Sequence, residues 1–281
     1  MKAAGSAGSR ISEFNAPTSR RQWPAFSPSW LRACRCAGRA SDRVRPGLAL
    51  VVFLALIGAC SGDSDELVAQ DVLSAIPWSA PETAHYRLLH DDDTKGSGEL
   101  RIEAREGALV LTQSFDIPDQ KITDTIQVEA DAQSLHPKVV QRTIDGPEGK
   151  RDCTATYQGN DVTVEQQAKD ENRKDQLTVP AQHYDSWSDL FLWRTLKFFE
   201  DEELKYVDVL TCSLTKPDLL PVVLTVKSRE EVNVPAGKFQ AWRLEIRSGG
   251  RTQKAWYADD AARTLVRYDN GDLVFELESL N

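Results

Sequence analysis

The stretch Leu100-Arg101-Ile102-Glu103-Ala104 decides the fold class, because its apolar and polar side chains alternate strictly. Residues 122–128, which read ITDTIQV, continue in the same style. Successive side chains of a β-strand point to opposite faces, so this period of two predicts strands with one buried and one solvated face. A surface helix would instead repeat its apolar residues every three to four positions.

Similar short stretches recur along the chain and are separated by Gly, Asp, Asn and Pro, the residues typical of turns. We predict strands at residues 86–89, 100–104, 109–115, 122–130, 138–144, 151–157, 162–166, 204–214, 222–230, 239–246, 253–258, 265–268 and 273–277. Sequential strands joined by short turns form an antiparallel meander. Long crossover helices, which a parallel sheet needs, are missing.

One segment departs from the β pattern. Residues 185–189 read DSWSD, which is typical of a helix start because Ser186 precedes Asp189 by three positions. Residues 190–199 then read LFLWRTLKFF and are apolar around most of a helix circumference, which is usual for a buried helix. The predicted fold is therefore mainly β: a strongly curved antiparallel meander, a half-barrel or barrel-like sheet, around one central helix.

The aromatic residues of this segment allow two interpretations. The simpler one is packing in the core. The functional one is that Trp187, Phe191, Trp193 and Phe198 line an apolar pocket for an acyl chain, since a curved sheet over a helix can enclose such a pocket.

The N-terminal region carries an export signal. Residues 47–59 read GLALVVFLALIGA, too short for a membrane span of ~20 residues but suited to the core of a signal peptide. Residues 57–60 read IGAC and resemble the lipobox of bacterial lipoproteins. That resemblance implies cleavage before Cys60 and a diacylglyceryl group on its sulfur, and Ser61 favours the outer membrane. An ordinary secretory signal or a short core helix is the alternative.

These features divide the chain into four parts. We interpret residues 1–42 as an N-terminal extension that is not native, 43–59 as a lipoprotein signal peptide and 60–77 as a lipidated tether. Residues 78–281 form one β-rich envelope domain. The expected location is the cell envelope, with acyl chains anchoring the protein in the outer membrane so that it faces the periplasm.

The charge distribution argues against a nucleic-acid partner. The whole chain has a formal net charge of −9, but residues 60–281 carry 25 basic and 41 acidic residues, a net charge of −16. Binding to nucleic acid needs a surplus of Lys and Arg to neutralise phosphates. The composition, 41% hydrophobic and 27% charged, also excludes a low-complexity chain and a polytopic membrane protein.

Two cysteines remain in the predicted domain, Cys153 and Cys212, which lie in strand-like stretches. An envelope protein folds in an oxidising compartment, so the pair is a candidate disulfide. The alternative is two free buried thiols that behave as small apolar side chains.

The C-terminal third carries a family resemblance. Residues 232–245 read VNVPAGKFQAWRLE and are similar to a "v-PAG-F-a-W-v" signature, and WYADD at 256–260 with RTLVRY at 263–268 resembles its continuation. Over residues 80–281 the chain resembles the bacterial envelope family called domain of unknown function 3108. The resemblance implies an exported β-rich protein whose activity is not established.

The sequence singles out no catalytic or metal-binding residues. Motifs of nucleotide-binding loops, zinc peptidases and serine hydrolases are missing. His85, His90, His136 and His183 stand apart in the sequence. Residues 91–96 read DDDTKG and fail the ligand spacing of a calcium loop. We predict a protein that is not an enzyme and that needs no metal and no cofactor.

Two functions follow from these features. The first is a lipid-anchored envelope protein that binds or carries an apolar molecule such as a lipid, supported by the anchor and the apolar helix. The alternative is a structural or adaptor lipoprotein whose acidic surface docks an envelope protein partner. A continuous apolar cavity would favour the first, and an exposed apolar patch on a filled core would favour the second.

Overall fold

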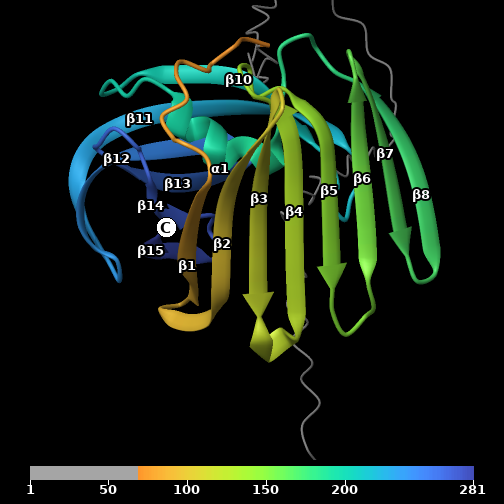
Figure 1. Ribbon diagram of the computed structural model, residues 1–281, viewed down its shortest axis with the longest axis horizontal. Helices are drawn as coiled ribbons and strands as arrows, with labels where there is room; N and C mark the ends of the chain where they lie inside the picture. The colour runs from red at the N-terminus through yellow and green to blue at the C-terminus, as the bar shows by residue number, and fades with distance from the viewer. Residues whose placement is uncertain (1–68) are drawn as a thin grey trace, which may run out of the picture.

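A 15-stranded sheet forms the body of the protein in the computed structural model, which describes residues 69–281 (Figure 1). The strand order is β8-β7-β6-β5-β4-β3-β2-β1-β15-β14-β13-β12-β11-β10-β9. Neighbouring strands are antiparallel except β9 and β10, which run parallel. The sheet has two free edges, β8 and β9, so it is open. The predicted antiparallel, mainly β fold is confirmed.

The first half of the sheet contains β1 (Glu82–His90), β2 (Asp93–Arg105), β3 (Ala108–Ile117), β4 (Ile122–Asp131), β5 (Pro137–Asp145), β6 (Arg151–Gln158), β7 (Asp161–Ala168) and β8 (Glu171–Thr178). The second half contains β9 (Tyr184–Asp185), β10 (Glu203–Leu210), β11 (Asp218–Val234), β12 (Gly237–Ser248), β13 (Arg251–Ala258), β14 (Leu265–Asp269) and β15 (Val274–Leu280). The short helices are η1 (Pro118–Gln120), η2 (Ser186–Ser188), α1 (Asp189–Leu192) and η3 (Trp193–Thr195).

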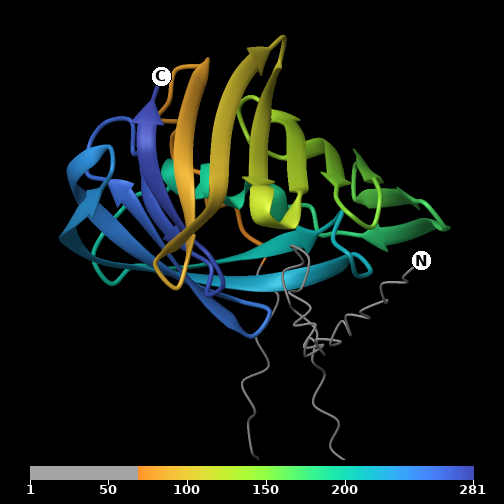
Figure 2. The same ribbon diagram turned by 90° about the horizontal axis from the view of Figure 1, so that it is seen from below.

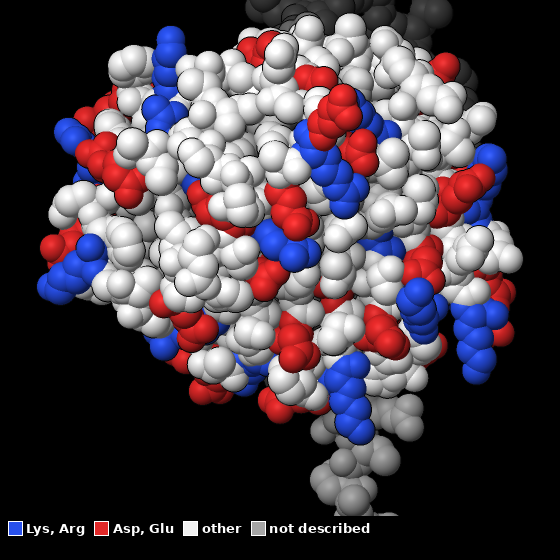
Figure 3. Space-filling view, in the orientation of Figure 1, with Lys and Arg blue, Asp and Glu red and all other residues white. Residues whose placement is uncertain are grey.

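The sheet curls around the helical residues 186–195 (Figures 1 and 2). Strand β15, near the C-terminus, pairs with β1 and so joins the two halves in the middle of the sheet. The alternation of side chains produces the core: Leu100 and Ile102 of β2 are buried, whereas Arg101 and Glu103 lie on the other face. On the outer face seen in Figure 3, basic and acidic side chains are interspersed.

The two halves of the sheet meet at a seam, which is formed by strands β5–β8 and by residues 211–215, the residues that follow β10. Side chains close it: the Arg142 guanidinium donates to the Cys212 carbonyl over 3.0 Å, and the Gln166 amide donates to the Ser213 carbonyl over 2.8 Å. Cys153 of β6 forms a disulfide with Cys212, the pair that the sequence offers as a candidate. A covalent bond and side-chain contacts thus join the two halves here.

The central helix is shorter than the sequence pattern suggests. Residues 186–195 form three consecutive helical pieces, η2, α1 and η3. The segment ends because its last carbonyl groups find other partners. The Leu192 carbonyl accepts from the Thr195 hydroxyl over 2.7 Å, and the Thr195 carbonyl accepts from the backbone N–H groups of Ser74 and Ala75. These bonds replace those of a further helical turn.

Those contacts also correct the interpretation of residues 60–77 as a tether. In the described part, residues 69–77, Val72 is buried in the core, and Asp71 accepts a hydrogen bond from the Tyr184 hydroxyl over 2.6 Å. This part is therefore docked on the fold, because an apolar side chain and backbone donors find partners there. The extension 1–42, the signal peptide 43–59 and Cys60 lie outside the described residues.

Strand β8 is absent from the sequence prediction. It reads ENRKDQLT, and its side chains are mostly exposed. An edge strand has one unpaired side, and charged residues there prevent pairing with other chains. Such a strand carries no alternation of apolar residues, which is why the pattern cannot find it. Within residues 69–281, helices long and apolar enough to cross a membrane are absent.

Candidate functional site

The curled sheet encloses a cavity of about 560 Å³ between the helical segment and one end of the molecule. Ligand pockets typically measure roughly 300–1,000 Å³. Its apolar walls come from both halves of the sheet and from the helical segment: Phe115, Ile117, Trp187, Leu190, Trp193, Leu210, Leu220, Ile246, Tyr268, Leu273 and Phe275. A ligand here would contact strands that are far apart in the sequence.

The rim of the cavity is polar. His90, Lys95, Arg251 and Asp272 lie on or beside the hairpins β1–β2, β12–β13 and β14–β15, and residues 119–120 come from η1. The Arg251 guanidinium lies 3.0 Å from the Asp272 carboxylate, and the His90 ring bonds the Asp272 carbonyl over 2.7 Å. The site therefore combines a polar opening with an apolar interior.

Two of the four predicted pocket aromatics, Trp187 and Trp193, line this cavity. Asp185, rather than Ser186, caps the segment at its start, since its carboxylate accepts from the Trp187 backbone N–H. The Trp187 indole N–H donates to the Thr211 carbonyl and the Trp193 indole N–H to the Tyr206 hydroxyl, each over 2.8 Å. Both rings are thus held in fixed orientations.

The other two aromatics do not belong to the cavity lining, which corrects the prediction for them. Phe191 is 1% exposed and packs in the core on another side of the helical segment. Phe198 follows the end of that segment, where the chain becomes extended at Leu196. Its ring packs near Trp242 and Tyr257, with centroids 6.2 and 6.1 Å away.

Carboxyl groups lie at the inner end of the cavity. Asp189 of α1 and Asp208 of β10 are part of the lining, and the carboxyl group of Asp208 hydrogen-bonds to that of Asp189. The Tyr206 hydroxyl donates to Asp189 over 2.8 Å. Asp185 lies behind them and accepts from the hydroxyls of Tyr157 and Thr211 over 2.6 Å each. We call Asp189 and Asp208 the acid pair.

Burial makes these acids weak. Loss of solvation raises the pKa of Asp185 to about 6 and that of Asp189 to about 7. The pKa of Asp208 is raised well above its ordinary value by burial and then by the nearby charge of Asp189. The acid pair therefore retains a proton near neutral pH, as two carboxyl groups in one site do.

Sequence reasoning did not single out the acid pair. The sequence indicates Asp189 only as part of a predicted helix start. Asp208 lies within Tyr206-Val207-Asp208-Val209-Leu210, where one acid interrupts an apolar strand and is 2% exposed. A carboxyl group on the buried face of a strand needs a partner or a function, and that is the signal that could have found it.

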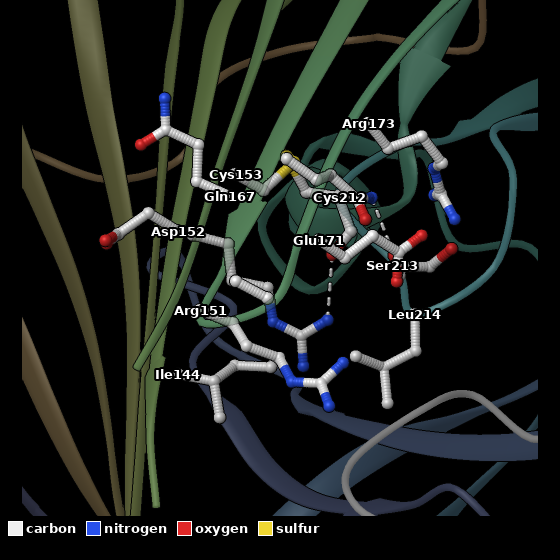
Figure 4. Close-up of a pocket in the computed structure, with 13 residues that line it drawn as sticks. Ile144, Arg151, Asp152, Cys153, Gln167, Glu171, Arg173, Cys212, Ser213 and Leu214 are labelled. Carbon is white, nitrogen blue, oxygen red and sulfur yellow. Dashed lines mark hydrogen bonds between the residues drawn. A yellow bond between two sulfur atoms is a disulfide. The ribbon is translucent and has the colours of Figure 1, made fainter. Parts of the chain in front are cut away.

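A second, smaller pocket of about 60 Å³ lies beside the disulfide at the seam. Figure 4 shows Cys153 next to Cys212, with Ser213 and Leu214 continuing from it. The arginines around it already have acidic partners: Arg151 is 3.3 Å from Glu148, and Arg173 is 2.6 Å from Asp175. With room for about two waters, this pocket is structural rather than a ligand site.

The histidines remain separate from the cavity interior. His136 and His183 stack with a centroid distance of 5.7 Å, and His183 stacks on Tyr157 at 5.5 Å. Among residues 69–281, groups of three or more His, Cys, Asp or Glu arranged to hold a metal ion are absent.

Comparison with known families identifies the chain at the level of its family. Residues 85–278 match the family described as protein of unknown function (DUF3108). The chain belongs to this family. The match covers strands β1 to β15, so the cavity of this DUF3108 protein lies within the family domain. None of the curated proteins matches the chain.

Solved structures similar to this DUF3108 protein have low sequence identity. A β-barrel-like protein of domain of unknown function DUF1849 from Brucella abortus is 11% identical with a TM-score of 0.46, covering 72% of this chain and 97% of that chain. A protein with a YmcC-like fold from Bacteroides fragilis is 11% identical with a TM-score of 0.27, covering 74% and 99%.

Proposed function

We propose that this protein is a lipid-anchored component of the bacterial cell envelope that binds or carries an apolar molecule in the cavity. One observation carries the proposal: a cavity of about 560 Å³ whose walls are mainly aliphatic and aromatic. Burial of apolar surface would supply the affinity, at about 25 cal/mol for each Å² removed from water. The polar rim lets the ligand enter from water.

The distribution of exposed apolar side chains favours binding over the adaptor function. An adaptor that docks through an apolar surface needs an exposed patch. Among the described residues, Phe199 and Leu280 are the large apolar side chains that are exposed, and they lie far apart in the sequence. The proposal treats the protein as a binding protein and not as an enzyme. Its anchor at Cys60 and its outer-membrane location rest on the lipobox resemblance.

The experiment is a titration of the purified full chain with diphenylhexatriene, a neutral apolar dye that fluoresces only away from water. We expect saturable binding at one dye per protein. Leu273→Trp, which narrows the cavity at a partly buried position, should weaken binding at least tenfold. Phe199→Trp is the matched control, since Phe199 is 61% exposed and outside the lining. Unsaturable binding, or equal binding by both variants, would contradict the proposal.

A further inference from the structure

The inner end of the cavity differs chemically from its walls. Asp208 is 2% exposed and forms part of the lining. Its carboxyl group bonds Asp189 and the Val209 backbone N–H, yet its Oδ1 atom is left without a hydrogen-bond partner. Among the described residues, Asp185, Asp189 and Asp208 also form no ion pair with Lys, Arg or His. A buried acceptor without a donor is costly and rare, which points to a ligand that supplies the donor.

We propose that the acid pair is a head-group site and that it selects molecules with an amine on an apolar body. The inference rests on the proposed function, because it assigns a chemical class to the ligand of the same cavity. The amine would bind Asp208 and Asp189, and the apolar body would contact the walls at Trp187 and Trp193.

An ammonium group fits this end better than other head groups. It offers three donors and a positive charge, and the two carboxyl groups of the lining supply acceptor atoms. Hydrogen bonds between ions are roughly twice as strong as neutral ones. A hydroxyl head group would offer one donor and no charge, and a carboxylate would add a further negative charge to three buried acids.

The proposed recognition depends on pH. The groups that face the acid pair are Asp185 of β9, Tyr157 of β6, Tyr206 of β10, Tyr257 of β13 and Tyr268 of β14. Burial raises the pKa of each tyrosine above its ordinary value, so these hydroxyls stay neutral. An alkylammonium keeps its proton to about pH 10. Binding should therefore strengthen from pH 6 to pH 8, as the acid pair loses its proton.

The test is calorimetric titration of the purified full chain with octylamine, 1-octanol and octanoate at pH 6 and pH 8. At pH 8 octylamine should bind at least tenfold more tightly than octanol. At pH 6, where the acid pair is still protonated, its binding should release a proton, detected with buffers of different ionisation enthalpy. Asp208→Asn should reduce the ratio of the two affinities to about one. The control Asp116→Asn changes an exposed carboxyl outside the cavity and should preserve the ratio.

The outcomes separate this inference from the proposed function. Equal binding of amine and alcohol, or tightest binding of octanoate, would overturn the amine assignment and leave the apolar-ligand function standing. Absence of binding by all three compounds, together with failure of the dye titration, would overturn both. If Asp208→Asn does not fold, Asp189→Asn and the pH profile of the unmodified chain decide in its place: binding that does not strengthen from pH 6 to pH 8 contradicts the inference.

Discussion

The buried carboxyl groups govern how stability responds to pH. The pKa values of Asp185, at about 6, and Asp189, at about 7, lie above the ordinary value of 3.8. The folded state therefore binds protons more strongly than the unfolded state does. The stabilisation is complete below about pH 4 and is lost as pH rises through 6 to 7. One pKa unit corresponds to about 1.4 kcal/mol, so we expect a loss on the order of 4 kcal/mol between pH 5 and pH 8.

Urea unfolding at a series of pH values measures this dependence. Asp208→Asn keeps the size of the side chain but removes a titrating group, so the loss between pH 5 and pH 8 should shrink. Asp116→Asn, at an exposed position, should keep the full loss. A wild-type protein that is more stable at pH 8 than at pH 5 would contradict the assignment of weak buried acids.

A second residue-scale prediction concerns the buried ion pair of Arg142 and Asp124. Their side chains are 2% exposed, and the guanidinium donates to both carboxylate oxygens, over 3.0 and 2.6 Å. The guanidinium carbon also lies 4.4 Å from the centroid of the Trp187 ring at the cavity. Arg142→Ala leaves Asp124 buried without its partner and should cost ~3–5 kcal/mol of unfolding free energy.

The double variant Arg142→Met with Asp124→Leu is the informative comparison. It removes both charges at once, so it should be more stable than Arg142→Ala. Chemical denaturation of the wild type and both variants measures the difference. A double variant less stable than Arg142→Ala would show that the pair contributes through its geometry rather than through its charge balance.

At the residue scale, the sequence identifies side chains by type but not by direction. It places Trp187, Phe191, Trp193 and Phe198 in one apolar segment. On a long helix, Trp187, Phe191 and Phe198 would share one face and Trp193 would lie on another. The structure separates them differently, because the segment is short and its last carbonyl, that of Thr195, accepts from the backbone N–H groups of Ser74 and Ala75. The orientations of Trp187 and Trp193, which face the cavity, are set by contacts with residues that are distant in the sequence. A local sequence pattern does not contain these contacts.

At the scale of elements, the seam determines how the two halves of the sheet are held together. The disulfide between Cys153 and Cys212 spans 59 residues. Closing a loop of that length in the unfolded chain is worth roughly 4 kcal/mol in the chain-entropy model. We expect the double variant Cys153→Ser with Cys212→Ser to lose an amount of that order, because side-chain hydrogen bonds are the other contacts that join the two halves at the seam.

Unfolding with and without a reductant tests this. Reduction should destabilise the wild type by as much as the double substitution does, and it should leave the double variant unchanged. If reduction has no effect on the wild type, the disulfide does not form in solution, and the seam rests on contacts such as that of Gln166 with the Ser213 carbonyl.

The sequence predicts most strands because most of them have one buried face. It finds the interior strands β2 and β4 from alternation alone. It misses β8, whose polar residues reflect its edge position, and β9, which has two residues and pairs only with β10. Both failures lie at the edges of the sheet, where backbone pairing rather than apolar patterning defines a strand.

At the scale of the molecule, the order of the strands predicts a single cooperative unit. The two halves share the β1–β15 ladder, and the helical segment bonds both: the Gln113 amide donates to the Trp187 carbonyl, and the Tyr257 hydroxyl donates to the Leu190 carbonyl. Neither half can unfold without exposing the cavity walls and the helical segment. This arrangement predicts a single cooperative unfolding transition despite the size of the sheet.

Native-state hydrogen exchange tests this prediction directly. Amides of β4 in the first half and of β12 in the second should exchange with the same free energy, equal to that of global unfolding. Amides of the edge strand β8 should exchange sooner, because it has one neighbour and exposed side chains. A ligand of the cavity at 100 times its dissociation constant should raise the exchange free energies of the β4 and β12 amides together, by about 2.7 kcal/mol. Protection that rises in one half alone would mean that the halves unfold separately and that the cavity does not couple them.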